Sequence, residues 1–261
     1  MKTLSIDVGI KHLAYCLFGD QCEIIQWGVC NLTNTEIILC KTCNKKAKYI
    51  KHEESYCKIH VKNKQYKIPT YNIEQIKKMK LAELKDTFNL TGKIRKRDAL
   101  VQILQNISDN YFDFISYRKT KDYDLVEIGE NLKNHFEALF GDVDLVLIEN
   151  QIGPLANRMK TLQGMIMQYF ILKGCCNIKQ ISSANKLSYF VDKKTTYNER
   201  KKLSIEITKK ILYNNNVYIK WVDFFIKNKK KDDLADSFLQ GISYFMKKEE
   251  LSIKNYKLRL T

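Results

Sequence analysis

The pattern of hydrophobic and polar positions predicts a group of strands followed by alternating helices and strands. Apolar runs predict strands at 3–6, 13–18 and 23–32, and Gly19 and Asp20 supply a hairpin turn between the last two. Further along, the pattern predicts strands at 143–148 and 177–182 and helices at 125–140, 157–173, 198–214, 218–227 and 231–248. This succession indicates an α/β fold with a mixed sheet flanked by helices.

A lysine-rich stretch separates the first three strands from the rest. It opens with metal-ligating residues in two closely spaced pairs, namely Cys40, Cys43, Cys57 and His60. Three thiolates and one imidazole suit the closed tetrahedral site of a structural Zn²⁺, which leaves no coordination position for catalysis. His52 is a second imidazole that could replace His60, and chance clustering is the plain alternative.

Two short amphipathic helices are predicted after the zinc site, at 79–86 and 97–104, around a turn that contains Gly92. This basic helix pair resembles a SAP motif, a small DNA-binding unit, although an ordinary helical hairpin has the same pattern. The predicted parts of the chain are therefore an α/β domain made of 1–33 and 122–261, a zinc-binding insertion at 34–70 and a SAP-like helical insertion at 71–121.

The net charge of the chain indicates which kinds of binding partner to expect. Lys and Arg number 45 against 29 Asp and Glu, a net charge of +16. A polyanion is the expected partner, with nucleic acid first and an anionic membrane surface second, and a merely solvated lysine-rich surface is the alternative. No signal peptide or membrane span is predicted, so we expect an intracellular protein without a membrane partner. The cysteines outside the zinc set lie in apolar runs and are expected to stay reduced, as small hydrophobic residues: Cys16, Cys22, Cys30, Cys175 and Cys176.

Four carboxylates fall where a sheet edge and a helix can meet. Asp7 and Glu149 each end a predicted strand, and Asp233 and Asp236 share one face of the last helix with Gln240. We expect this face to lie above the sheet rather than in the core. Clustered carboxylates suit Mg²⁺, and two such ions can activate a water and stabilise the leaving oxygen in phosphodiester hydrolysis. Taken singly, each residue also fits a turn, an ion pair or a helix N-terminus.

Three segments resemble, in order and context, the motifs of RuvC-like Holliday junction resolvases: Ser5–Lys11 (SIDVGIK), Leu147–Gln151 (LIENQ) and Asp233–Ser237 (DLADS). The pattern is closest to the resolvases of poxviruses and other large DNA viruses, with those of fungal mitochondria next. The resemblance covers about residues 1–33 and 122–248. It implies an RNase H-like fold, a homodimer, Mg²⁺-dependent two-metal catalysis with Mn²⁺ as a substitute, and paired nicks across a four-way junction.

Carried over residue by residue, the resemblance implies a catalytic, Mg²⁺-binding tetrad of Asp7, Glu149, Asp233 and Asp236, with Asp232 as an alternative to Asp233. It also places the helix at 157–173 near a dimer axis, although ordinary core packing explains its apolar residues equally well. The expected phosphate contacts, each of which has a solvated lysine face as its alternative, are Lys11, Lys186, Lys229, Lys230 and Lys231.

Other functions stay open at this point. A strand–Asp-x-Gly–hairpin start is shared with actin-like ATPases, but the later glycine-rich phosphate turns of those enzymes are missing here. A different RNase H-like nuclease, acting on flaps or RNA–DNA hybrids, and a non-enzymatic zinc-containing DNA-binding protein are the remaining alternatives. For a viral resolvase we expect the host cytoplasm, and otherwise the mitochondrion or nucleus.

Overall fold

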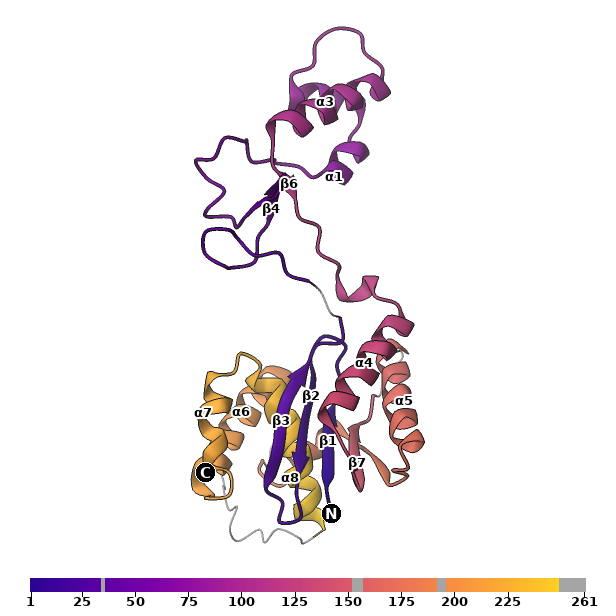
Figure 1. Ribbon diagram of the computed structural model, residues 1–261, viewed down its shortest axis with the longest axis vertical. Helices are drawn as coiled ribbons and strands as arrows, with labels where there is room; N and C mark the ends of the chain where they lie inside the picture. Colours follow the sequence, from indigo (N-terminus) through magenta and orange to yellow (C-terminus); the bar gives the residue numbers. More distant parts are fainter. Residues whose placement is uncertain (34–35, 152–156, 192–195, 249–261) are drawn as a thin grey trace. The chain divides into compact units, whose positions relative to one another are not determined.

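The computed structural model describes residues 1–33, 36–151, 157–191 and 196–248. The chain forms two compact units, each of which is described by itself (Figure 1). Unit 1 consists of Met1–Asn34 and Lys119–Thr261, and unit 2 is Thr35–Arg118. The zinc-binding and helical insertions, expected as separate pieces, therefore belong to one unit.

A five-stranded mixed sheet with the order β3-β2-β1-β7-β8 forms the centre of unit 1. The first three strands pair antiparallel, whereas β7 pairs parallel with both β1 and β8. The strands are β1 (Thr3–Asp7), β2 (Leu13–Phe18), β3 (Ile24–Cys30), β7 (Leu145–Glu149) and β8 (Ile178–Ile181). This is the RNase H-like arrangement that the resemblance implies, and the expected mixed α/β sheet is confirmed.

Helices cover both faces of this sheet, which explains why β2 and β7 are apolar runs rather than alternating patterns (Figure 1). Leu4, Ile6 and Ile148 face α4 (Leu125–Leu139) and α5 (Asn157–Leu172). Cys16 and Phe18 face the opposite group of helices. That group consists of α6 (Tyr197–Asn214), α7 (Val222–Lys227) and α8 (Lys231–Lys247). Short 3₁₀ helices occur at Thr120–Asp122 (η1), Ser183–Lys186 (η2) and Ile219–Trp221 (η3).

Helix α8 is buried more deeply than its sequence pattern predicts. Its face with Gln240 was expected above the sheet, but the Gln240 side chain is fully buried against it. The helix lies between the sheet and α6, so both of its faces are packed. Gly241 permits this approach, because a Cβ atom there would lie 2.3 Å from a ring carbon of Phe18.

Unit 2 contains a three-stranded sheet and three helices. The two predicted helices are confirmed as α2 (Leu81–Phe88) and α3 (Lys96–Asn110), and they pack with α1 (Ile73–Lys78) around Ile76 and Leu84. The sheet, with the order β5-β4-β6, and α1 were not predicted. Its strands are only two or three residues long and therefore have no readable period: β4 (Tyr49–Lys51), β5 (Glu54–Tyr56) and β6 (Asp113–Phe114).

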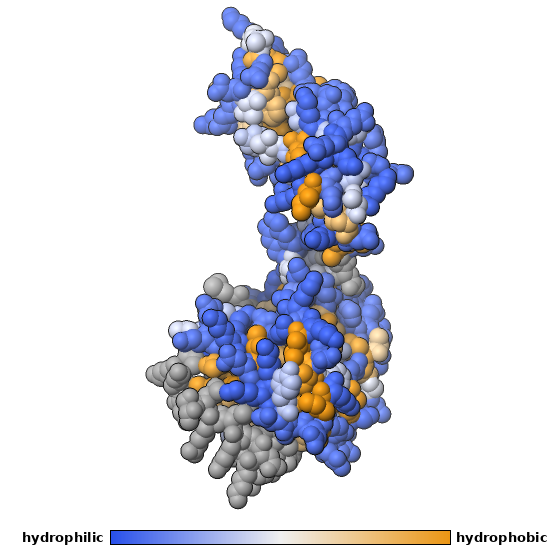
Figure 2. Space-filling model, turned by 90° about the vertical axis from the view of Figure 1, so that its left-hand side faces the viewer, coloured by the Kyte–Doolittle hydropathy of each residue, from blue (hydrophilic) through white to orange (hydrophobic). Residues whose placement is uncertain are grey.

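Surface properties agree with the basic composition. The face in Figure 2 is mostly hydrophilic on both units, with smaller hydrophobic areas between the polar side chains. Within the part of the chain that is described, no helix is long and apolar enough to cross a bilayer. Four of the five cysteines outside the zinc set are buried as expected, but Cys176 is exposed, because it lies in the loop before β8 rather than in a strand.

Candidate active site

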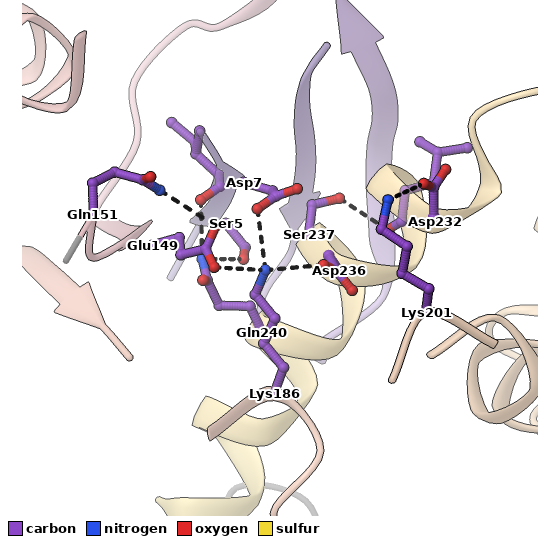
Figure 3. A network of polar contacts seen from close by, with 12 residues as sticks. Ser5, Asp7, Glu149, Gln151, Lys186, Lys201, Asp232, Asp236, Ser237 and Gln240 are labelled. Carbon is purple, nitrogen blue, oxygen red and sulfur yellow. Dashed lines mark hydrogen bonds and ion pairs between the residues drawn. The ribbon is translucent and has the colours of Figure 1, made fainter. Parts of the chain in front are cut away.

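Two strand ends bring the first pair of carboxylates together. Asp7 is the last residue of β1 and Glu149 the last residue of β7. The two strands are parallel neighbours, and Ile6 pairs with Ile148, so the residues that follow lie side by side at one edge of the sheet. Asp236, on the second turn of α8, points to the same place (Figure 3).

A buried ammonium lies at the centre of these carboxylates. Lys186 Nζ is 3.1 Å from Asp7 Oδ1 and 3.3 Å from both Glu149 Oε1 and Asp236 Oδ2 (Figure 3). Only 5% of the Lys186 side chain is exposed, because η2 turns it inward from the end of β8. Lys186, expected as a phosphate contact on the positive surface, lies instead inside the carboxylate cluster.

Burial and charge act against each other in this cluster. Burial raises the pKa of Asp7 to about 7; the Lys186 ammonium opposes this, while Glu149 adds to it. Burial also raises the pKa of Asp236. Desolvation alone would lower the pKa of Lys186, but attraction to Asp7, Asp236 and Glu149 outweighs it and raises that pKa. The site therefore has more negative charge than its single internal cation balances.

The fourth carboxylate of the expected tetrad reaches the same cavity. Asp233 lines it, whereas Asp232 turns away and forms an ion pair of 2.9 Å with Lys201. Asp233 Oδ2 is buried and accepts no hydrogen bond, although the Lys230 ammonium lies 3.5 Å away. Burial, followed by repulsion from Asp232, raises the pKa of Asp233. Asp233 is therefore better placed than Asp232 to be the fourth metal ligand, because only Asp233 faces the cavity.

Amide and hydroxyl groups hold the carboxylate-bearing elements in place. Gln240 Nε2 donates to Ser5 Oγ, to the Ile6 carbonyl and to the Leu147 carbonyl, at 3.1–3.2 Å. One side chain of α8 thereby links β1 and β7 immediately before Asp7 and Glu149 (Figure 3). The Ser204 hydroxyl hydrogen-bonds to Asp236 and lowers its pKa against the effect of burial. Small displacements of these strands would change the spacing of the carboxylates.

Helix α6 forms the other wall of a cavity of about 680 Å³ over the carboxylates. Four residues on one face of its first turns line this cavity: Tyr197, Arg200, Lys201 and Ser204. Our sequence analysis missed them, although their spacing on one helical face was a usable signal. The other expected phosphate contacts do not line the cavity, and among them Lys11 and Lys229 are exposed, whereas Lys230 and Lys231 are half-buried.

The cysteine and histidine set in unit 2 has the geometry of a zinc site. Its four ligand atoms, from Cys40, Cys43, Cys57 and His60, all lie within 4.8 Å of one another. The Cys43–Cys57 sulfur distance is 3.8 Å, and His60 Nδ1 lies 3.7 and 3.6 Å from the Cys40 and Cys57 sulfurs. Zn–S bonds of about 2.3 Å in a tetrahedron place two sulfurs about 3.8 Å apart. The set can therefore bind Zn²⁺.

Local backbone hydrogen bonds position the zinc ligands and favour ionisation of Cys40. Two turns close by N–H···O bonds, from Asn44 to the Cys40 carbonyl and from Val61 to the Cys57 carbonyl. Burial of Cys40 opposes its ionisation, but nearby backbone N–H donors outweigh burial and lower the pKa of Cys40 to about 5. His52 lies outside the set and contacts Tyr66, so His60 is the imidazole of this site.

A mixed sheet of this order, with carboxylates at the ends of its central parallel strands and on the last helix, defines an RNase H-like nuclease. The profile of the poxvirus A22 protein matches residues 104–248, more than half of the chain. The chain belongs to this family, which is that of the poxvirus Holliday junction resolvases. The matched region includes Glu149, Lys186, Asp233 and Asp236 but not Asp7.

Similar individual proteins come from large DNA viruses. The uncharacterized protein L451 of Acanthamoeba polyphaga mimivirus is 28% identical over 330 aligned positions, which cover 99% of this chain and 78% of that protein. The fowlpox virus resolvase in complex with Holliday junction DNA has a TM-score of 0.42 and 17% identity, covering 95% of this chain and 98% of that one. A second structure of the fowlpox virus Holliday junction resolvase has the same TM-score, 15% identity and coverage of 95% and 99%. The assignment rests on the family match.

Proposed function

We propose that this protein is a Holliday junction resolvase that hydrolyses DNA phosphodiester bonds at four-way junctions with Mg²⁺ as its cofactor. One observation carries the proposal. In a chain of the poxvirus A22 family, Asp7, Glu149, Asp233 and Asp236 converge on a single cavity from three separate elements. An ordinary structural role would not require four carboxylates at one place.

The residues at this cavity fit a divalent metal ion. All four side chains offer carboxylate oxygens, which Mg²⁺ prefers, and the buried Asp233 Oδ2 accepts no hydrogen bond among the described residues, although it faces the Lys230 ammonium at 3.5 Å. When bound, Mg²⁺ would lower the pKa of a water molecule and neutralise charge on the reacting phosphate. Mn²⁺, which accepts the same ligands, would substitute.

The chain's own groups have separate tasks in this proposal. Asp7, Glu149, Asp233 and Asp236 would hold the metal, and Gln240 keeps the strand ends that bear Asp7 and Glu149 at a constant spacing. Lys186 limits repulsion between the carboxylates and supplies a fixed positive charge beside the reacting phosphate.

Phosphate contacts outside the cavity would come from basic side chains near its edge. Lys11 follows the β1 strand end, and Lys229, Lys230 and Lys231 precede and open α8. Each neutralised phosphate releases counterions, so binding should weaken steeply as salt increases. We assign Zn²⁺ at Cys40, Cys43, Cys57 and His60 a structural role, because four protein ligands leave no open position.

We further propose that the protein acts as a homodimer. A four-way junction presents two equivalent phosphates related by a two-fold axis, and a two-fold dimer presents two equivalent sites. The outer surfaces of α4 and α5 carry exposed apolar side chains, among them Val126, Ile171 and Leu172. Ile171 and Leu172, adjacent on the last turn of α5, offer an exposed apolar contact for self-association, while the inward Leu162, Ile166 and Phe170 belong to the core.

The test is cleavage of matched substrates with Mg²⁺. A labelled four-way junction, a flap, a linear duplex and an RNA–DNA hybrid are incubated with wild type and with Asp7→Asn, Glu149→Gln, Asp233→Asn and Asp236→Asn. We expect cleavage of the junction above all others, and a loss on the order of 10³-fold in each variant, since each removes a ligand of the reacting centre. Junction binding should persist in gel-shift assays, because removing a carboxylate reduces repulsion of DNA.

Asp223→Asn is the matched control, because this exposed α7 carboxylate pairs with Lys227 and does not line the cavity. Asp232→Asn discriminates between the neighbouring carboxylates and should cut at near wild-type rates. If it is inactive while Asp233→Asn cuts, the two residues exchange roles. Preference for flap or hybrid would identify another nuclease of this fold. Binding without cleavage of any substrate in Mg²⁺ or Mn²⁺ would refute the enzymatic proposal.

A further inference from the structure

We propose that Arg200 and Tyr197, on the first turns of α6, bind the nucleotide next to the cleaved phosphodiester bond. Arg200 would contact its phosphate, and Tyr197 would stack on its base. The inference rests on the proposed nuclease function and adds to it a substrate-positioning wall. Both side chains line the cavity whose opposite wall carries the carboxylates.

Tyr197 and Arg200 lie on a face of α6 that becomes part of the core further along the helix. Spacings of three and four residues place Tyr197, Arg200 and Ser204 on one face of the helix. One turn later this same face is buried core, where Ile207 and Ile211 are fully inaccessible. An inward helical face is ordinarily apolar along its whole length. Here its first turns carry an aromatic and a cationic residue that face open space, which is the pattern of a ligand site.

The exposure and the contacts of the Arg200 and Tyr197 side chains also support the proposal. Arg200 is exposed, and among the described residues its guanidinium has no ion pair or side-chain hydrogen bond, whereas the adjacent Lys201 is neutralised by Asp232 at 2.9 Å. Tyr197 is 63% exposed, and the Lys201 ammonium lies 5.2 Å from its ring centre. A guanidinium without a partner in the described part of the chain and a largely exposed aromatic ring match the two parts of a nucleotide, phosphate and base.

The two walls of the cavity differ in charge, and this difference would orient the bound DNA strand. The carboxylate wall repels phosphate except where metal ions neutralise it, so only the reacting phosphate belongs there. The next phosphate of the DNA strand needs positive charge elsewhere. Arg200, which lines the same cavity of about 680 Å³, supplies that charge. A cavity of this size takes a nucleotide-sized ligand. The DNA strand would therefore cross the mouth of this cavity, with the reacting phosphate at the carboxylates and the neighbouring phosphate at Arg200.

The decisive experiment removes charge from the protein and from the DNA in turn. Single-turnover cleavage of a four-way junction is measured for wild type, Arg200→Ala and Arg200→Lys, with Lys202→Ala as control. Lys202 is an exposed cation on the same helix that does not line the cavity. The same series is run on junctions with one uncharged methylphosphonate at each position within two nucleotides of the cut. We expect Arg200→Ala to cut about 10- to 100-fold more slowly, as for loss of a charge-assisted hydrogen bond, with partial recovery in Arg200→Lys.

At one methylphosphonate position, wild type should be as slow as Arg200→Ala, because the phosphate charge that Arg200 contacts is already gone. A purely structural role for Arg200 would give the same defect at every position. In parallel, Tyr197→Ala should cut about 5- to 100-fold more slowly and Tyr197→Phe near wild type, and one abasic nucleotide beside the cut should remove that difference. If wild type cuts the junction while Arg200→Ala matches Lys202→Ala, or no position absorbs the defect, the inference is overturned. Absence of wild-type cleavage would instead refute the proposed function.

Discussion

Replacing the buried ammonium of Lys186 with the uncharged side chain of methionine tests how the carboxylate cluster is balanced before metal binds. Lys186→Met keeps most of the side-chain volume and removes the charge that lies 3.1–3.3 Å from Asp7, Glu149 and Asp236. The three carboxylates would then repel one another in a site where Asp7 and Glu149 are only 15% and 16% exposed. We expect a large loss of stability in the metal-free protein and recovery when Mg²⁺ is added.

The magnitude follows from the burial of the partners. Removing one member of a buried charge pair typically costs about 3–5 kcal/mol. The Asp236 side chain is 33% exposed, so solvent screens part of the repulsion and about 2–4 kcal/mol is the better expectation. For a unit of this size each kcal/mol lowers the melting temperature by about 2–4 °C, which predicts a loss on the order of 10 °C.

The pH of the assay matters because the pKa of Asp7 is raised to about 7. An acid with a raised folded-state pKa contributes stability that is present below its unfolded pKa and is lost as pH rises through 7. Melting is therefore followed at pH 8, above this pKa of the wild-type protein, in EDTA and then at increasing Mg²⁺. A metal ion that binds only the folded state raises stability by mass action, so Lys186→Met should gain more from Mg²⁺ than wild type.

The exposed Lys202→Met is the control, because it changes the same net charge without touching the cluster. Lys186→Met should also cut junctions much more slowly even when it is fully folded in Mg²⁺, since the fixed charge beside the reacting phosphate is missing. Equal melting temperatures of Lys186→Met and Lys202→Met in EDTA would refute the reasoning, because the buried ammonium would then have no role in balancing the carboxylates.

Two further predictions concern the zinc site and the assembly. Wild type purified without chelator should contain about one Zn²⁺ per chain, and Cys43→Ser or Cys57→Ser should lose it and unfold unit 2, since metal affinity there is folding energy. The exposed Cys176→Ser should retain zinc, and metal-free wild type by elemental analysis would contradict the assignment. Light scattering should give a dimer, and mixed wild-type and Asp7→Asn chains should nick only one strand of a junction. A monomer on the junction, or paired nicks from the mixture, would argue against the dimer.

The sequence predicts well whatever depends on strand ends and on short spacings. Asp7 and Glu149 are 142 residues apart, yet both end strands of a parallel pair, so one topological rule brings them together. The zinc set is predictable because its two pairs each close a local turn. In both cases the relevant geometry is local to each segment, and the fold only has to bring two segments together.

Side chains whose position depends on distant packing were not predictable in the same way. Lys186 reads as a surface lysine, because nothing near it in sequence shows that η2 turns it toward Asp7, which lies 179 residues away. Gln240 reads as part of an exposed acidic face, because the burial of α8 on both sides depends on α6. Arg200 lies among several basic residues at the start of α6, where only the position of that helix over the cavity distinguishes it from Lys202.

The position of unit 2 in the chain explains why it can differ from the rest without disturbing the site. It follows β3 and precedes α4, and neither of these elements contributes a side chain that lines the cavity over the carboxylates. The match to the poxvirus A22 family begins at residue 104, within α3, and therefore leaves out both the zinc set and Asp7. Asp7 lies outside the matched region, but the parallel pairing of β1 with β7 places it beside Glu149 regardless of the residues between them. The zinc set belongs to unit 2 and the carboxylates to unit 1, so loss of zinc should change DNA binding or stability before it changes the chemistry of cleavage.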